Sequence, residues 1–415
     1  MINKFRQIVS NKNYRPLIEN ILSLGVLQLV NLLMPLVVLP YLLKTIGFNH
    51  YGIIVVAASL VMYFQSLTDY SFAITGTRDV AIFRESKKKL DLIFSKIMTV
   101  KLLFLVISLL VISGIVFLIP KFSDYKEIVF LSTGILIGNV LFPDWFFQGI
   151  EKMKFITIIN TSVKILFTIL VFIFIKGKND FWIYPLLQSL GYVFSGLIAL
   201  MVILFHYKVK FHFLKRKKII QTIKDNFPIF INQFMPVLYN NTSSFLLGIM
   251  VSNSAAGIFD SLKKIIDMAI MFIGVISRAF FPFMNRQKNF FPKYKKMLLS
   301  IASLLAIIIL LFSKYIFSYF SIDYKNSIFI LGILCVGILG IAIYNIFGTN
   351  YLIVNRKDKL VMKNTFYASI LGFAISFPLI YYLGIIGGAI SLSFSRLFLG
   401  LGVVYLYNEI SKNEK

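Results

Sequence analysis

Ionisable side chains stand inside several long apolar stretches of this chain. The richest group follows a helical repeat, because Asp260, Lys263, Lys264 and Asp267 occupy positions i, i+3, i+4 and i+7 and so share one helix face. The same face continues to Arg278. Charges within hydrocarbon are costly and by default line a protein interior or a watery cavity. We predict that this stripe lines a cavity; the alternative is that its acids merely neutralise the lysines and staple helices together.

Further polar side chains extend this prediction to other apolar stretches. Lys164 and Arg396 stand deep in their stretches, where reaching the membrane surface by snorkelling is difficult. Gln233, Asn240 and Asn241 follow one rough helix face and predict a polar lining suited to sugar hydroxyls. Hydrogen bonding between helices is the competing explanation for these amides.

Residue patterns for catalysis or metal binding are missing from the sequence. The three histidines, His50, His206 and His212, are widely spaced and have no metal-ligand pattern around them. No Walker-type phosphate-binding motif occurs. We therefore expect no metal, no cofactor and no enzymatic activity, and leave proton or sodium coupling open.

The composition indicates that the chain lies in a membrane, where charged side chains are sheltered from the lipid. Of the 415 residues, 58% are hydrophobic and only 14% are charged, against about 25% charged in soluble domains. Runs of about 20 apolar residues span a bilayer. Such runs predict an all-α polytopic membrane protein with twelve spans, at roughly 17–43, 51–74, 96–119, 127–148, 155–175, 182–206, 227–250, 256–282, 297–318, 327–349, 365–383 and 386–408.

The basic residues set the predicted orientation. A net charge of +26 would suit a nucleic-acid binder on a soluble surface, but here the cations fall mostly in short polar gaps between apolar runs. About 30 fall on the side of the termini and about 6 on the other, a bias that predicts cytoplasmic termini and no nucleic-acid partner. The short outer loops count against an enzyme that works outside the membrane.

The chain is predicted to form two six-helix bundles around a central cavity. Their boundaries are 1–206 and 227–415, joined by a basic cytoplasmic linker at 207–226. A faint repeat of Asn31 to Pro35 at Asn232 to Pro236 supports two related halves. The prolines of the first and seventh spans predict bends or hinges there.

Two stretches of sequence resemble the Wzx-like polysaccharide flippases, a branch of the multidrug/oligosaccharidyl-lipid/polysaccharide exporter superfamily. The first runs from Gly47 to Ala81 and includes Leu67-Thr-Asp69-Tyr70 and Thr77-Arg78-Asp-Val-Ala81. The second, more specific stretch follows span four and contains Pro143, Asp144, Trp145, Gln148, Gly149 and Glu151. We interpret Arg78 and this second motif as gating or structural elements, with Gly149 allowing a tight helix end and Glu151 pairing with basic loop residues. Lys264 stands where that family commonly has a basic residue, whereas Ser71 and Ser243 replace its frequent Gly and Asp.

The resemblance implies a flippase in the bacterial inner membrane. Its substrate would be an undecaprenyl-diphosphate oligosaccharide, and its partners the lipid bilayer, a polymerase and a chain-length regulator. Cations in a protein cavity would lower the cost of moving the diphosphate through hydrocarbon.

Two other functions remain as alternatives. A multidrug or small-cation exporter of the same superfamily would need an acidic cavity, but cations outnumber Asp69, Asp260 and Asp267 within the spans. A membrane-embedded enzyme that modifies polysaccharides is less compatible with the short outer loops.

Overall fold

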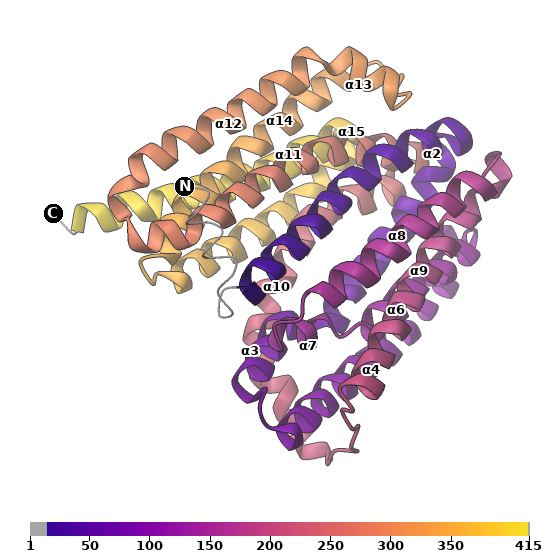
Figure 1. The fold of residues 1–415 in the computed structure, drawn as a ribbon. Coiled ribbons are helices and arrows are strands. Elements are labelled where there is room, and N and C mark those ends of the chain that lie inside the picture. Colours follow the sequence, from indigo (N-terminus) through magenta and orange to yellow (C-terminus); the bar gives the residue numbers. More distant parts are fainter. Residues whose placement is uncertain (1–14, 414–415) are drawn as a thin grey trace. The chain divides into compact units, whose positions relative to one another are not determined.

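The computed structural model describes residues 15–413, and the regular elements in that range are all helices (Figure 1). Their bounds are α2 Arg15–Asp69, α3 Phe72–Phe83, α4 Lys87–Leu118, α5 Pro120–Ser123, α6 Lys126–Leu141, α7 Asp144–Gly149, α8 Lys154–Phe174, η1 Lys178–Trp182, α9 Ile183–Met201, η2 Val202–His206, α10 Arg216–Met250, α11 Asn253–Arg286, η3 Lys288–Phe290, α12 Phe291–Leu311, α13 Ser313–Tyr319, α14 Ser327–Ile343, η4 Tyr344–Ile353 and α15 Asp358–Asn413.

The described helices account for the predicted spans. Nine helical segments between residues 23 and 412 are long and apolar enough to cross a membrane. The segments Ser23–Phe83 and Asp358–Lys412 are each long enough for two crossings and contain a sharp kink. Helix α10 contains the remaining predicted span, 227–250. The chain is therefore a polytopic α-helical membrane protein with about a dozen crossings.

Glycines rather than prolines mark the two sharpest bends. Gly47 has φ 75° and Gly384 has φ 56°, and each divides a long helix into two. No heavy atom lies within 4 Å of a Cβ added at either position, so glycine is needed there for its backbone conformation and not for space. In α2 the chain stays helical through Pro35 and Pro40. The break in α2 lies at Gly47, and a hinge at the prolines stays a prediction.

The helical conformation is also interrupted between α2 and α3. Tyr70 and Ser71 both have positive φ, 40° and 63°, which non-glycine residues rarely adopt. A glycine, frequent at the position of Ser71 in the resembling family, would adopt this conformation without strain. The break turns the chain directly after Asp69.

Backbone contacts divide the chain into two compact units. Unit 1 consists of the chain up to Val38 together with Leu60–Gln233, and unit 2 consists of Leu39–Ser59 together with the chain from Phe234 onward. The second span is thus divided, with its first part in unit 2.

Glycines permit close helix contacts within each unit. In unit 1, a Cβ at Gly138 of α6 would lie 2.2 Å from the backbone of Tyr192 in α9. In unit 2, a Cβ at Gly340 of α14 would lie 2.4 Å from the carbonyl oxygen of Arg396 in α15. Small residues at such crossings let membrane helices approach closely.

The predicted linker is only partly irregular. Helix α10 begins at Arg216, so the second half of 207–226 is helical. The first half is fixed to α4, because the backbone N–H of Lys210 donates to Asp91 at 2.8 Å and that of His212 donates to the Ser95 hydroxyl at 2.9 Å.

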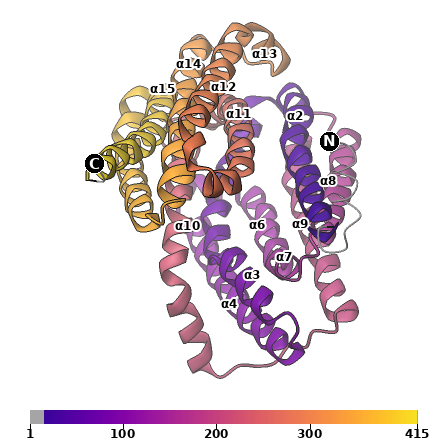
Figure 2. The same ribbon diagram turned by 60° about the vertical axis from the view of Figure 1, so that its left-hand side comes forward.

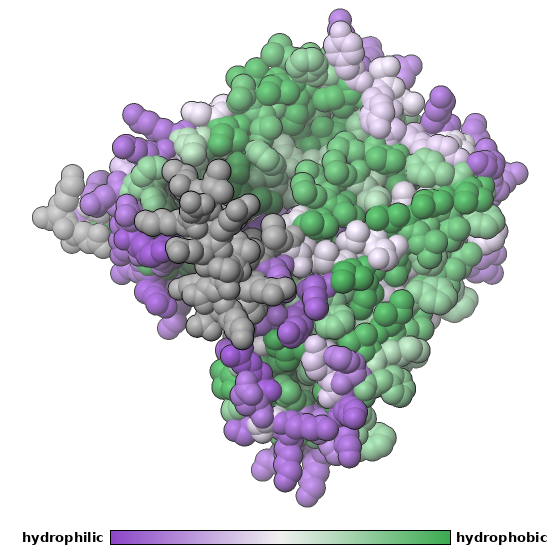
Figure 3. All heavy atoms as spheres, viewed as in Figure 1, coloured by the Kyte–Doolittle hydropathy of each residue, from purple (hydrophilic) through white to green (hydrophobic). Residues whose placement is uncertain are grey.

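The outer surface of the helices is apolar. Figure 3 shows hydrophobic residues over α8 and α12, with hydrophilic residues at the end of unit 1 where α3 ends and α4 begins. Large side chains such as Leu110, Leu166 and Leu311 are more than half exposed. An apolar exterior of this kind fits contact with lipid tails.

Candidate functional site

The first part of the charged stripe on α11 consists of an ion pair, Asp260 with Lys264, and both residues hydrogen-bond to Tyr51. The Lys264 ammonium lies 3.0 Å from a carboxylate oxygen of Asp260, one helical turn away. The hydroxyl of Tyr51 donates to the same carboxylate at 2.6 Å and accepts a hydrogen bond from Lys264. Asp260 is buried, whereas 36% of the Lys264 side chain is exposed. Lys264 is therefore held by its partners and still accessible.

The other half of the stripe joins α11 to α15 and α10. One oxygen of Asp267 accepts from Lys263 at 2.9 Å, and the other accepts from Arg396 at 2.6 Å. The same nitrogen of Arg396 donates to the side-chain oxygen of Asn240 at 3.1 Å. We call these residues, with Tyr51, Asp260 and Lys264, the unit 2 charge network.

Arg396 is unusually placed within this network. Only 3% of its side chain is exposed, and its Nε and Nη1 atoms have no hydrogen-bond partner within the described part of the chain. Space for it depends on α14, because a Cβ at Gly337 would lie 3.0 Å from the Arg396 Cδ. A buried guanidinium with unused donors is costly, which makes it the network member best suited to attract an additional acceptor.

Three of the predicted lining residues do not join the network. Asn241 donates to the backbone oxygen of Ser59 at 2.6 Å, with both residues buried. This contact ties α10 to α2 and fits the alternative of hydrogen bonding between helices. Arg278 and Gln233 are exposed on α11 and α10, and neither has an ion pair or hydrogen bond to the described residues.

A smaller network in unit 1 surrounds Asp69. Lys101 of α4 donates to one Asp69 oxygen at 3.3 Å, and the side-chain amide of Asn139 in α6 donates to the other at 3.2 Å. Lys101 also donates to the backbone oxygen of Asn139 at 3.2 Å. The burial of the pair is unequal, because 2% of the Lys101 side chain is exposed against 40% of Asp69.

Lys164 belongs to unit 1 and has a neutral partner. Its ammonium donates to the side-chain oxygen of Asn31 at 2.5 Å, which joins α8 to α2. One turn further along α8, the Thr168 hydroxyl contacts the Met34 sulfur at 3.4 Å. No carboxylate among the described residues lies within ion-pair distance of Lys164.

The motif after span four forms the short helix α7, which packs against α3. Asp144 begins this helix, and its carboxylate accepts from the Trp145 N–H at 2.8 Å and the Gln148 amide at 3.3 Å. Pro143, immediately before α7, is buried, and Trp145 is completely buried. A Cβ at Gly149 would lie 2.5 Å from the side chain of Val80. Gly149 therefore permits close packing on α3, and its φ is not positive.

The turn after α7 fastens this motif to two other segments. Glu151 pairs with Arg84 at 3.2 Å, and both side chains are largely exposed, so this pair contributes little to stability. The Asn20 side chain donates to the Glu151 carbonyl oxygen at 3.0 Å and accepts from the Met153 N–H at 3.1 Å. Burial beside this motif raises the pKa of the Tyr207 hydroxyl above its usual value.

The sequence of this chain matches a known protein family. Residues 17–288 match the family described as "Polysaccharide biosynthesis protein". The chain belongs to this family. The resemblance found in the sequence motifs is thereby confirmed.

Two relatives match across nearly the whole chain. A putative O-antigen transporter of Escherichia coli (strain K12) is 28% identical over 391 residues, which cover 92% of this chain and 94% of the relative. A putative O-antigen transporter of Shigella dysenteriae is 26% identical over 395 residues, which cover 92% and 98%.

Solved structures share the fold. An inward-facing multidrug resistance MATE family transporter of the MOP superfamily has a TM-score of 0.60 at 14% identity, covering 91% of this chain and 95% of that one. The lipid II flippase MurJ in an inward closed conformation has a TM-score of 0.56 at 14% identity, covering 94% and 87%. This chain therefore shares its helical fold with these transporters.

Four residues that bond to these charged side chains were not predicted from the sequence. Lys101 stands near the start of its predicted span, where a lysine ordinarily reaches the membrane surface. Asn31 and Asn139 are neutral and Tyr51 is amphipathic, so none signals a buried charge by type alone. Only their contacts with Lys164, Asp69 and Asp260 reveal them.

Proposed function

We propose that this protein is a flippase that moves lipid-linked oligosaccharides from the inner to the outer face of the bacterial cytoplasmic membrane. The substrate is an undecaprenyl-diphosphate oligosaccharide, destined for a surface polysaccharide. Support comes from membership of the polysaccharide biosynthesis family and from two putative O-antigen transporters that match over 92% of the chain. Alternating access of the two units, with both termini cytoplasmic, completes the proposal.

The unused donors of Arg396 in the unit 2 charge network are the observation that carries the choice of substrate. Among the described residues, Asp260 pairs with Lys264, and Asp267 pairs with both Lys263 and Arg396. An anion that enters this network meets the Nε and Nη1 atoms of Arg396, which have no hydrogen-bond partner in the described part of the chain. A diphosphate accepts several charge-assisted hydrogen bonds at once, so it can compete with the carboxylates for these cations.

The same unused donors count against the multidrug alternative. The fold is shared with MATE transporters and cannot separate the two functions. The buried guanidinium of Arg396 would repel a cationic drug, whereas it would attract an anionic diphosphate. We propose Lys164 as a further cation on the substrate path, coupling to protons or sodium, and cooperation with a polymerase and a chain-length regulator.

Variants of Lys264 test whether its charge is used for transport. If positive charge is required, Lys264→Arg retains transport while Lys264→Ala and the double variant Lys264→Ala with Asp260→Ala lose it, at matched protein levels. Tyr51→Phe is the control, because it removes the hydroxyl that contacts Asp260 and leaves both charges in place. Full transport by the double variant would show that the pair only staples the helix.

Deletion of the gene in its host tests the function itself. Without the protein, lipid-linked repeat units should accumulate on the cytoplasmic face of the membrane, and the wild-type gene should clear them. Normal export of the polysaccharide in the deletion strain, with no other flippase gene present, would overturn the proposal. Raised drug sensitivity with unchanged glycan export would support the multidrug alternative.

A further inference from the structure

A small pocket in unit 1 shares no residue with either charge network. It has a volume of about 130 Å³ and is bounded by residues 72–79 of α3, residues 93–97 of α4 and residues 222–226 of α10. Figures 1 and 2 show these three segments gathered at one end of unit 1. Charge asymmetry predicts that this end faces the cytoplasm. The Thr77-Arg78-Asp79 motif supplies two of its lining residues, Arg78 and Asp79.

Aromatic contacts hold the start of α10 against the rest of the pocket. The ring of Tyr70 stacks on Phe230 at 4.6 Å and contacts Phe72 at 6.0 Å. The Tyr70 hydroxyl donates to the backbone oxygen of Ile223 at 3.2 Å. Because Phe72 is itself a lining residue, these contacts fix one wall of the pocket. The cavity is therefore part of a packed arrangement of helices.

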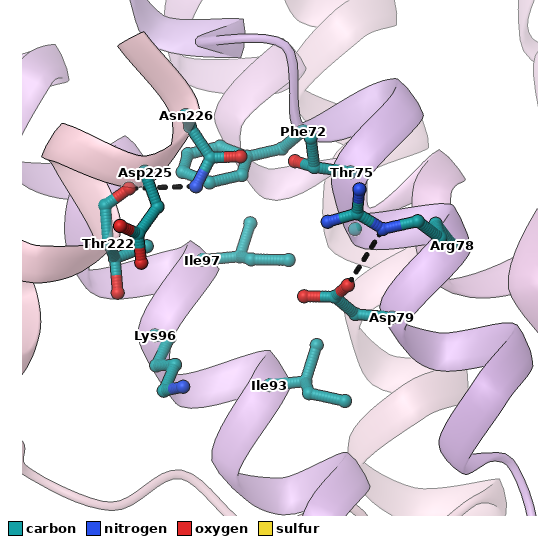
Figure 4. A pocket seen from close by; sticks show the side chains of 11 residues that line it. Phe72, Thr75, Arg78, Asp79, Ile93, Lys96, Ile97, Thr222, Asp225 and Asn226 are labelled. Atoms are coloured by element: carbon teal, nitrogen blue, oxygen red, sulfur yellow. Dashed lines mark hydrogen bonds and ion pairs between the residues drawn. The ribbon is translucent and has the colours of Figure 1, made fainter. Parts of the chain in front are cut away.

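The lining combines an apolar wall with polar groups of both signs. Phe72, Ile93 and Ile97 form the apolar part. Two cations and two carboxylates face it, together with hydroxyl and amide groups; these are Arg78, Lys96, Asp79, Asp225, Thr75, Thr222 and Asn226 (Figure 4).

Several of these polar atoms are available to a ligand. Arg78 donates to one oxygen of Asp79 at 3.2 Å, and the Asn226 amide nitrogen donates to the Thr222 backbone at 2.7 Å. Lys96 forms no ion pair or hydrogen bond with any part of the chain that the structure describes. The pocket therefore offers both donors and acceptors that its own side chains do not consume.

We propose that this pocket binds one neutral sugar unit of the glycan on the cytoplasmic side, an inference that rests on the proposed flippase function. Balanced charges disfavour a phosphate, which the two carboxylates would repel, and equally a simple cation, which Arg78 and Lys96 would repel. A sugar hydroxyl both donates and accepts hydrogen bonds, and its ring presents an apolar face. Mixed linings of this kind orient small polar ligands.

The volume is consistent with a ligand of this size. At about 30 Å³ of liquid for each water, the cavity has room for several water molecules. A single sugar ring can replace them while keeping their hydrogen bonds through its hydroxyls. The pocket would then select the glycan before the diphosphate reaches the unit 2 charge network.

Two pairs of matched variants test the proposal. Thr222→Trp fills the pocket, whereas Ile220→Trp places the same side chain at an exposed position two residues away. Lys96→Met removes a cation that forms no ion pair or hydrogen bond with residues 15–413, and Lys88→Met removes an exposed lysine of the same helix outside the pocket. The Thr222 hydroxyl bonds within its own helix, to the Lys218 backbone oxygen, so neither pocket variant removes a side-chain hydrogen bond or ion pair between described helices.

Binding is measured on the purified full-length protein by saturation-transfer NMR with methyl glycosides of hexoses, N-acetylhexosamines and 6-deoxyhexoses. We expect one class to bind saturably, and expect Thr222→Trp and Lys96→Met to weaken it by at least about tenfold while both controls bind normally. If no sugar shows saturable binding, or if Thr222→Trp binds sugar as tightly as the wild type, then the pocket holds water only.

The outcome is separable from that of the flippase proposal. If the wild-type gene clears accumulated lipid-linked glycan and Thr222→Trp clears it at the same rate and binds sugar normally, the pocket inference fails and the flippase function stands. If the wild-type gene does not clear it but sugar binding depends on Thr222 and Lys96, the pocket stands and the flippase function fails.

Discussion

The unequal burial of the Asp69 and Lys101 pair predicts unequal costs for removing its members. Asp69→Asn removes the negative charge and leaves the Lys101 ammonium, 2% exposed, without its ion-pair partner. Lys101→Met removes the positive charge and leaves the Asp69 carboxylate, 40% exposed, with its hydrogen bond from Asn139 at 3.2 Å. The two variants break the same ion pair but leave different charges behind.

The burial of each remaining charge sets the magnitude. An unpaired buried charge costs roughly 3–5 kcal/mol, so Asp69→Asn should lower the free energy of unfolding by about that amount. A partly exposed carboxylate can recruit water, which reduces the cost of Lys101→Met to about 1–2 kcal/mol. The double variant should cost less than Asp69→Asn alone, because it leaves no unpaired charge, with a coupling energy of about 1–3 kcal/mol.

Thermal unfolding of the purified full-length variants in detergent, followed by size-exclusion fluorescence, provides the assay. The expected order of midpoints is wild type, Lys101→Met, then Asp69→Asn, with the double variant above Asp69→Asn. A lower midpoint for Lys101→Met than for Asp69→Asn, or simple additivity in the double variant, would refute the reasoning from burial.

Three further predictions concern the backbone and the helix contacts. Ser71→Gly should change the free energy of unfolding by less than about 1 kcal/mol, whereas Ser71→Val should lower it by at least about 1–2 kcal/mol, because φ is 63° at this position. Equal thermal midpoints for the two variants would show that the backbone of residue 71 is not strained. Gly149→Ala should cost about 1–3 kcal/mol by crowding α3, and the control Gly332→Ala, with open space around it, should cost nothing measurable by the same assay. Asn241→Leu should cost about 0.5–1.5 kcal/mol by removing a buried hydrogen bond between α10 and α2, and should spare transport. Loss of transport at normal stability would indicate that this residue lies on the substrate path.

Hydropathy and helical spacing predicted the larger features of this fold. The spans from 96–119 onward correspond to described helices, and the stripe from Asp260 to Asp267 lies on one helix with its ion pairs at the expected one-turn spacing. Both features depend on local sequence, because the periodicity of a helix fixes which residues are neighbours.

Contacts between distant segments could not be predicted in this way. The proximity of Arg396 to Asp267 depends on the packing of α15 against α11, for which no local pattern exists. The spacing near Gly149 suggested a helix end, whereas the structure requires a small residue against Val80. The helix break at Gly47 is likewise set by positive φ and not by the nearby prolines, which a helix can tolerate in a membrane protein.

Transport by the purified protein in liposomes tests the central claim most directly. A fluorescent undecaprenyl-diphosphate oligosaccharide would be placed in both leaflets, and an impermeant quencher added outside would report the fraction that becomes accessible. We predict that liposomes with the wild-type protein expose the inner-leaflet pool, that Lys264→Ala slows this exposure, and that Lys264→Arg does not. An inner pool that stays as protected as in protein-free liposomes would contradict the account.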